Sequence, residues 1–295
     1  MILALSRGLS LLLATLFLLD TSQNAFAADE EASLVNEAVA SRVISIGGAL
    51  TETIYALGRE EVLIASDITS YFPEAAASLP KVGYQRALSS EGILSLKPDL
   101  ILASEEAGPL SVVQQIQSTG IRWVTLPTPE SLDDVYQNIE QLGAILGARN
   151  KANSLVEDIK KQASVLQQHI NHQEGSSRIL FVLQHTGGAP MVAGSNTSAH
   201  RIIELAGARN ALEEVEGYKP MTPEAVVQAR PDLILTTRMG LDQVGGVEAM
   251  LGIPGLALTP AGRQQRVVAM DSLLLLGFGP RTVSAAEQLH QHWIN

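Results

Sequence analysis

Tyr84 and Arg86 are two residues whose types and spacing can do chemistry. They occur in the run Lys81-Val-Gly-Tyr-Gln-Arg86. A phenolate is a hard anionic oxygen donor suited to Fe(III), but a free tyrosine has a pKa of about 10, so ligation needs the metal itself or a nearby cation to favour the anion. Arg86, two residues on, can supply that cation. The alternative is a tyrosine that packs between elements with its hydroxyl bonded to backbone, and the residues alone favour that alternative.

Other candidate residues stand where expected strands end. His185 closes the apolar run Arg178-Ile-Leu-Phe-Val-Leu183 and is either a ligand or a hydrogen-bonded strand-end residue. Arg238 follows a second apolar run, and its guanidinium is either a fork for carboxylates or a solvated surface group. Tyr71 and Tyr218 are further candidates at the same edges. His200 is a weaker one, and the remaining histidines are expected to be solvated: His169, His172, His290 and His292.

A duplicated stretch organises the chain. Glu91-Gly-Ile-Leu-Ser-Leu-Lys-Pro-Asp-Leu-Ile-Leu-Ala103 returns as Glu224-Ala-Val-Val-Gln-Ala-Arg-Pro-Asp-Leu-Ile-Leu-Thr236. Each copy predicts a short helix that ends before a proline and leads into a buried strand. Gly83-Tyr84 precedes the first copy much as Gly217-Tyr218 precedes the second, so Tyr218 is the natural rival of Tyr84 as a ligand. Two diverged copies favour two similar lobes over a solenoid of many units.

The elements around these residues alternate between strand and helix. This rhythm predicts an α/β fold of two Rossmann-like lobes with parallel sheets. Residues 151–172 carry apolar side chains at steps of three or four without Gly or Pro, so one helix of about 33 Å is expected between the two copies. Ligands of open α/β sheets bind beyond the carboxyl ends of the strands, which places the candidate residues of both lobes around one cleft.

The composition limits the compartment and the partners. Residues 1–27 have one early arginine, an apolar run and an Ala-Phe-Ala site, which predict a secretory signal peptide, with an N-terminal membrane anchor as the alternative. Residues 28–150 then form the first lobe, 151–172 the helix and 173–295 the second lobe. The 295-residue chain has no cysteine and a formal charge of −11, which disfavours nucleic acid and anionic membranes as partners. We expect a monomer in the periplasm without stable membrane insertion.

These features together resemble a known family, the haem-binding periplasmic proteins of bacterial ABC importers. The resemblance covers the whole mature chain. It rests on the signal peptide, the repeated Glu-x6-Pro-Asp-Leu-Ile-Leu, the lone interlobe helix, the run from Lys81 to Arg86 continuing into Leu88-Ser-Ser-Glu-Gly-Ile-Leu94, and Leu183-Gln-His185. The wider class of siderophore, cobalamin and haem binders shares the rigid helix between lobes.

The resemblance implies roles for individual residues. It makes Tyr84 the axial ligand of ferric haem, with Arg86 hydrogen-bonded to the phenolate. Some members hold two stacked haems, one of them on a histidine of the opposite lobe. His185 lies near that position, although Thr186-Gly-Gly-Ala-Pro190 departs from the pattern. Glu91 and Glu224 match glutamates that bind arginine pockets on the two permease subunits of a transporter with its ATPase. Their alternative role is to favour a helix N-terminus.

Two other readings stay open for the function. A siderophore or cobalamin binder of the same class would use Tyr84 only as a wall of the cleft. A haem chaperone or sensor of another class would bind haem without a transporter. An enzyme is not expected, since the sequence has no Gly-x-Ser-x-Gly elbow, P-loop, dinucleotide fingerprint or cysteine nucleophile.

Overall fold

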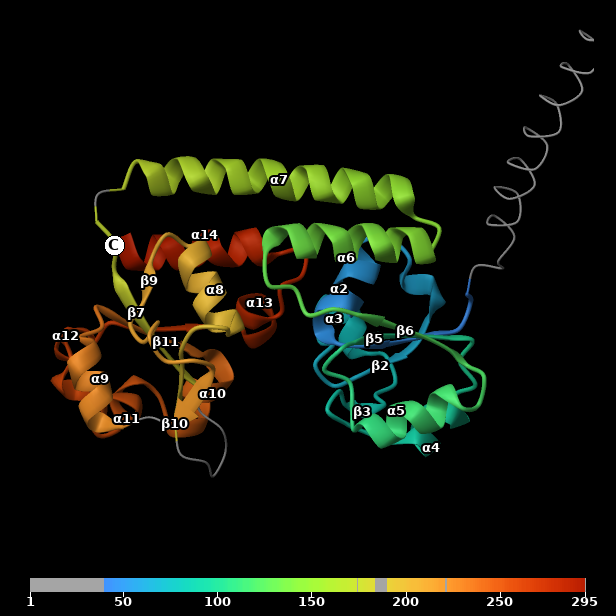
Figure 1. Ribbon diagram of the computed structural model, residues 1–295, viewed down its shortest axis with the longest axis horizontal. Helices are drawn as coiled ribbons and strands as arrows, with labels where there is room; N and C mark the ends of the chain where they lie inside the picture. The colour runs from blue at the N-terminus through green and yellow to red at the C-terminus, as the bar shows by residue number, and fades with distance from the viewer. Residues whose placement is uncertain (1–39, 174, 184–189, 221, 295) are drawn as a thin grey trace, which may run out of the picture. The chain divides into compact units, whose positions relative to one another are not determined.

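Figure 1 shows the computed structural model of the 295-residue chain. The residues that it describes are 40–173, 175–183, 190–220 and 222–294. The predicted signal peptide and the candidate His185 lie outside the described residues.

The first sheet has four parallel strands in the order β2-β1-β5-β6. Its central strands β1 and β5 are mostly apolar and buried because helices cover both faces of the sheet. Val43 of β1 packs in the cluster that holds α2 and α6, and its neighbour Ile44 packs in the cluster that holds α4 and α5. The strands are β1 (Val43–Ile46), β2 (Leu63–Ser66), β5 (Leu100–Ser104) and β6 (Arg122–Leu126), with a separate antiparallel hairpin of β3 (Gly83–Tyr84) and β4 (Ala87–Leu88). The helices are α2 (Gly48–Ala56), η1 (Glu60–Val62), α3 (Glu74–Ala77), α4 (Ser90–Ser95), α5 (Leu110–Gln117) and α6 (Leu132–Ile145). We call this part the N-terminal lobe.

The second sheet is mixed, whereas the sequence predicted a parallel one. Its order is β10-β8-β7-β11-β12, with β9 also paired to β7. Strands β7, β9, β11 and β12 are parallel, but β8 is antiparallel to β7 and β10 is antiparallel to β8. The connection from Leu183 to Met191 is shorter than the dozen or so residues that a parallel crossover needs, so the chain returns antiparallel. The strands are β7 (Arg178–Leu183), β8 (Met191–Ala193), β9 (Arg209–Asn210), β10 (Tyr218–Pro220), β11 (Leu233–Thr237) and β12 (Val267–Met270).

Short helices complete this C-terminal lobe, and their first residues follow local capping rules. Thr222 accepts a hydrogen bond from the N–H of Ala225, and Pro223 occupies the first helical position of α9. The helices are α8 (Ser198–Leu205), α9 (Pro223–Ala229), α10 (Arg238–Val244), α11 (Val247–Leu251), η2 (Leu256–Leu258), α12 (Pro260–Arg263), α13 (Ser272–Leu276) and α14 (Thr282–Ile294).

The long helix between the lobes is α7, which runs from Arg149 to Asn171. Its 23 residues span about 34 Å at 1.5 Å per residue. It lies along α6 of the N-terminal lobe and α14 of the C-terminal lobe (Figure 1). Its inner face buries Ala152, Val156, Ile159 and Leu166. The fold of two α/β lobes joined by one helix is therefore confirmed.

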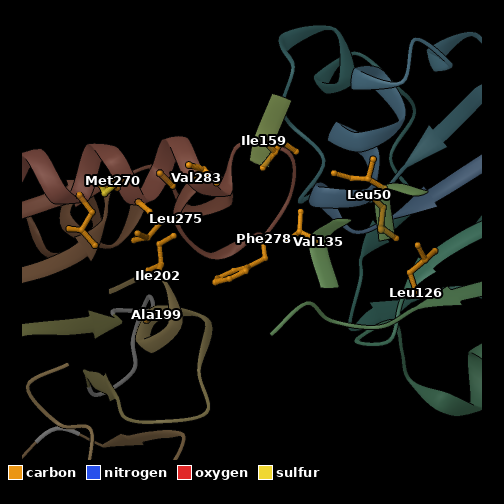
Figure 2. Packing of buried hydrophobic residues seen from close by; sticks show 14 of the residues in the cluster. Leu50, Leu126, Val135, Ile159, Ala199, Ile202, Met270, Leu275, Phe278 and Val283 are labelled. Carbon is orange, nitrogen blue, oxygen red and sulfur yellow. The ribbon is translucent and has the colours of Figure 1, made fainter. Parts of the chain in front are cut away.

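One apolar cluster extends from the N-terminal lobe through α7 into the C-terminal lobe. Figure 2 shows Leu50 and Val135 of the first lobe, Ile159 of α7, and Ile202 and Val283 of the second lobe as members of this cluster. Burial of a large aliphatic side chain contributes about 1.5–3 kcal/mol. A shared core of this kind opposes independent movement of the two lobes.

The two repeat copies use the same backbone conformation where helix gives way to strand. Lys97 and Arg230, the matching residues before the prolines, have φ values of 48° and 47°. This left-handed conformation costs a non-glycine residue about 1 kcal/mol or more. The proline that follows disfavours the right-handed helical conformation at these two positions, and the helices end one or two residues earlier, at Ser95 and Ala229.

The matching aspartates explain why the repeat contains Pro-Asp. Asp99 accepts hydrogen bonds from the N–H groups of Ser41 and Arg42, and Asp232 accepts one from the N–H of Arg178. In return the N–H of each aspartate donates to the carbonyl of the same arginine, over 3.0 Å at Arg42 and 2.8 Å at Arg178. Each aspartate therefore fixes the first strand of its lobe beside the strand that follows the repeat.

His290 is buried, and the prediction that it is solvated was wrong. Its side chain is 1% exposed. Its Nδ1 lies 3.0 Å from the carbonyl oxygen of Ala206, and its ring meets Trp293 edge to face. Helix α14 turns this face toward α8, so a histidine near the chain end serves the core.

Candidate functional site

Tyr84 stands on the short β3–β4 hairpin at the carboxyl edge of the first sheet. Its side chain is 39% exposed, which leaves the phenol accessible. Gly83 has a φ of 102°, a conformation that favours glycine, and its carbonyl accepts a hydrogen bond from the N–H of Ile68 over 2.9 Å. The tyrosine is thus presented by a hairpin that is fastened to the loop after β2.

A buried polar network supports that loop. Asp67 is fully buried, and its carboxylate accepts hydrogen bonds from the Gly47 N–H, the Thr69 hydroxyl and the Ser70 hydroxyl over 2.9, 2.7 and 2.8 Å. Lys81 donates to the Ser66 hydroxyl and to the carbonyls of Ser70 and Ala76. Burial lowers the pKa of Lys81, and Asp67 opposes this shift. A satisfied buried carboxylate resists rearrangement, so the strand ends are held firmly.

Arg86 is paired with Glu106, a residue that the sequence analysis did not single out. Its guanidinium forms an ion pair with the Glu106 carboxylate, and the Gln85 amide donates to the same carboxylate over 2.9 Å. Burial alone would lower the pKa of Arg86, but Glu106 raises it above its ordinary value. Its place in the sequence could have indicated it, because Glu106 comes two residues after the end of β5, and ligands of α/β sheets bind beyond the strand ends.

Tyr218 is the residue of the C-terminal lobe that interacts with Arg86. It begins β10, and its ring meets Phe181 edge to face with centroids 6.5 Å apart. Burial raises the pKa of Tyr218 to about 12, while the Ala199 N–H and the Arg86 charge act in the opposite direction. Arg86 also interacts electrostatically with Tyr84. One guanidinium is therefore within electrostatic reach of a phenol from each lobe.

Tyr71 lies in a polar seam between the lobes, and its hydroxyl already has partners. It donates to the Asp271 carboxylate over 3.2 Å and accepts from the Leu273 N–H over 2.8 Å. Burial raises the pKa of Tyr71 to about 12, and Asp271 adds to the shift.

The seam continues at Glu52, which is almost completely buried. The Arg281 guanidinium binds its carboxylate with two hydrogen bonds of 2.8 and 2.7 Å. The same guanidinium lies 3.4 Å from the ring centroid of Phe72, a cation–π contact. This bidentate pair joins residues 229 positions apart in sequence and links the two lobes.

The remaining candidates of the second lobe differ in accessibility. Arg238 is the first residue of α10 and is exposed, and its neighbour Met239 is 57% exposed. His200 is mostly buried in α8, with Nε2 3.2 Å from the Glu204 carboxylate. Within the described ranges, no group of three or more His, Asp or Glu side chains could hold a free metal ion.

Glu91 and Glu224 occupy equivalent positions on the two lobes. Each lies in the first turn of a short helix, α4 or α9, and each is exposed. Among the described residues, neither carboxylate has a side-chain hydrogen bond or an ion pair. Both are therefore available to a partner.

Comparison with known proteins gives the family. The profile described as periplasmic binding protein matches residues 43–274, and the chain belongs to that family. It is a substrate-binding protein of the ABC importer class and not an enzyme. Proteins of this class work with a membrane permease and its ATPase, in the periplasm or outside the cell. In the described part of the chain, no helix is long and apolar enough to cross a membrane.

Three relatives illustrate the range of the family. The periplasmic haem-binding protein BhuT, solved in complex with two haems, is 43% identical, with a TM-score of 0.81 and coverage of 85% of this chain and 97% of that one. An uncharacterised ABC transporter substrate-binding lipoprotein of Bacillus subtilis, YvrC, is 28% identical over 84% of this chain and 78% of its own length. A vitamin B12-binding protein of Pectobacterium atrosepticum is 29% identical over 85% of this chain and 88% of its own.

Proposed function

We propose that this protein captures ferric haem and delivers it to the permease of an ABC importer. The observation that carries the proposal is the electrostatic grouping of Arg86 with Tyr84 of one lobe and Tyr218 of the other. A ferric porphyrin needs an anionic oxygen donor for its iron and cations for its two propionates. The likeness to BhuT, whose structure contains two haems, supports haem as the substrate.

Tyr84 is the proposed iron ligand, because its side chain is exposed and lies within electrostatic reach of the Arg86 guanidinium. The Arg86 guanidinium can donate a hydrogen bond to the oxygen of an iron-bound Tyr84. Tyr218 is more buried and lies on the opposite lobe, where it contacts the porphyrin or serves as the rival ligand. Arg238 is proposed to bind a propionate, and Tyr71 to line the base of the site. His185 is the proposed ligand of a second haem, but it lies outside the described residues.

Glu91 and Glu224 are proposed to bind arginines on the two permease subunits. Their exposure, their equivalent places in the two copies and their lack of partners among the described residues support this role. A carboxylate in the first turn of a helix also stabilises the helix by about 0.3–1 kcal/mol. Helix stabilisation alone does not explain why both carboxylates lack side-chain partners among the described residues, whereas binding to a permease does.

Vitamin B12 is the second candidate substrate, because relatives of 26–29% identity are vitamin B12-binding proteins. Ferric siderophores belong to the same alternative. A haem chaperone or sensor that never meets a permease is the alternative of another class. Glu91 and Glu224 have no side-chain partner among the described residues, and this favours a permease partner.

The proposal also includes the removal of a signal peptide and the boundaries of the two lobes. We propose that residues 1–27 are a signal peptide removed on export to the periplasm. The mature chain would then be a monomer that consists of lobes 28–150 and 173–295, joined by the helix 151–172.

The test is a parallel titration of the purified mature protein with ferric haem and with cyanocobalamin. We expect a saturable Soret shift with haem and no saturable binding of cyanocobalamin. Saturation at two haems for each chain would support a second site. Tight binding of cyanocobalamin without a haem response would overturn the haem proposal.

A further inference from the structure

Glu106 connects the segment that follows β5 to the turn of the Tyr84 hairpin. Its carboxylate accepts from both side chains of that turn, the Gln85 amide over 2.9 Å and the Arg86 guanidinium. Backbone bonds run between the same segments, since the Gly108 N–H donates to the Gln85 carbonyl and the Leu88 N–H donates to the Gly108 carbonyl, each over 2.8 Å. The carboxylate is therefore carried by a segment whose backbone is fixed to the hairpin.

The ion pair leaves most of the Arg86 fork available. A guanidinium has five N–H donors in a rigid plane. Within the described part of the chain, the Arg86 guanidinium donates one side-chain hydrogen bond, from Nη2 to Glu106. One bond to Glu106 can thus orient the plane while the other donors remain open to a ligand.

The orientation matters because of what lies around Arg86. Tyr84 and Tyr218, from different lobes, both interact with its charge. An arginine side chain that is half-exposed and unpaired samples many rotamers, and fixing it in advance removes that entropy cost from ligand binding.

We propose that Glu106 is a positioning residue for ligand capture, which holds the Arg86 guanidinium in the orientation that serves the ligand beside Tyr84. Two measurements test this inference. The one of haem affinity rests on the proposed haem function, whereas the one of Arg86 mobility in the ligand-free protein does not. The other role that Glu106 can have is direct: its carboxylate would repel the propionates of the ligand, and its removal would then strengthen binding.

The first readout uses the ligand-free protein. The order parameter of the Arg86 side-chain Nε–Hε group is measured by ¹⁵N relaxation in the wild type, in Glu106→Gln and in Glu105→Gln. Glu105 is the adjacent exposed carboxylate, and no side-chain bond to it is found among the described residues, so it is the matched control. We expect an ordered group in the wild type and the control, and a mobile one in Glu106→Gln. Equal mobility in all three proteins would overturn the proposal whatever the ligand is.

The second readout is haem affinity in a double-mutant cycle of Glu106→Gln and Arg86→Gln. If Glu106 acts through Arg86, its replacement weakens binding about three- to tenfold in the wild type and less than about twofold in the Arg86→Gln background. Stronger binding in Glu106→Gln, or an equal effect in both backgrounds, would overturn the positioning role in favour of a direct effect. Failure of every variant and the wild type to bind haem would contradict the proposed function, and the relaxation measurement would still decide the role of Glu106.

Discussion

In both copies of the repeat, a short helix ends just before a left-handed basic residue, and a proline follows. An aspartate then bonds to the arginine at the start of the neighbouring strand, which is Arg42 immediately before β1 or Arg178 as the first residue of β7. The tyrosines that precede the copies differ. Tyr84 is followed by Gln85 and Arg86, both bonded to Glu106, whereas Tyr218 is followed by Lys219 and Pro220 within an edge strand.

This difference separates two kinds of residue. Residues that end helices and fix strands recur because each lobe has the same change from helix to strand. Residues of the proposed ligand site need not recur, because a porphyrin held between the lobes would present different atoms to each of them. Tyr84 is exposed and has Arg86 in the same hairpin, whereas Tyr218 is more buried. We therefore expect unequal roles for the tyrosines and equal roles for the aspartates.

The largest expected effect comes from the tyrosines. Tyr84→Phe should weaken haem binding at least about a hundredfold, since loss of a metal ligand exceeds the 10–100-fold cost of losing an outer support. Tyr218→Phe should weaken it less than about tenfold. Fluorescence-quenching titrations with ferric haem measure both constants. Equal losses of haem affinity in the two variants would show that the two tyrosines contribute equally to ligand binding.

The aspartates should show the opposite behaviour. Asp99→Ala and Asp232→Ala each remove a carboxylate that accepts backbone N–H groups, and each should lower the unfolding free energy by about 2 kcal/mol. Urea denaturation of both variants measures this, with Asp242→Ala, an exposed aspartate of α10, as the control. A loss below about 0.5 kcal/mol in either variant would break the equivalence of the two copies.

The two glutamates should also be equivalent, in transport rather than in stability. Glu91→Lys or Glu224→Lys should lower haem uptake by reconstituted transporter about tenfold, because each reverses one charge at a proposed subunit contact. Haem affinity should stay unchanged. Glu74→Lys and Glu248→Lys, exposed first-turn glutamates of α3 and α11, are the controls. Unchanged uptake in both test variants would refute the docking role.

The smallest expected effect concerns pH. Because the pKa of Tyr218 is about 12 in the folded protein and about 10 in the unfolded chain, the folded state keeps its proton longer as the pH rises. The folded state then binds more protons than the unfolded state, so the unfolding free energy falls between pH 10 and pH 12. Tyr218→Phe should remove about 1 kcal/mol of this fall between pH 10 and pH 11. An unchanged pH slope in the variant would show that Tyr218 is not buried as described.

The fold was predictable from the sequence because its signals are local. Apolar runs, helix ends and the 3.6-residue period of α7 lie within short windows, and the structure confirms them. The antiparallel strands β8 and β10 were missed because each is only three residues long.

Most contacts of the candidate site depend on residues distant in sequence. Outside the site, the Glu52–Arg281 pair and the hydrogen-bond contact of His290 with the Ala206 carbonyl join residues 229 and 84 positions apart, so spacing could not predict them. Glu106 was missed for the same reason, although its place after β5 was visible. The ligand roles of Tyr84, Arg86 and Tyr218 stay predictions.

Resonance Raman spectroscopy of the ferric haem complex tests the central claim most directly. Excitation in the phenolate-to-iron charge-transfer band enhances ring vibrations of a coordinated tyrosinate. These vibrations should be present in the wild type and in Tyr218→Phe and absent in Tyr84→Phe. Their loss in Tyr218→Phe and persistence in Tyr84→Phe would contradict the account and move the iron to the other copy of the repeat.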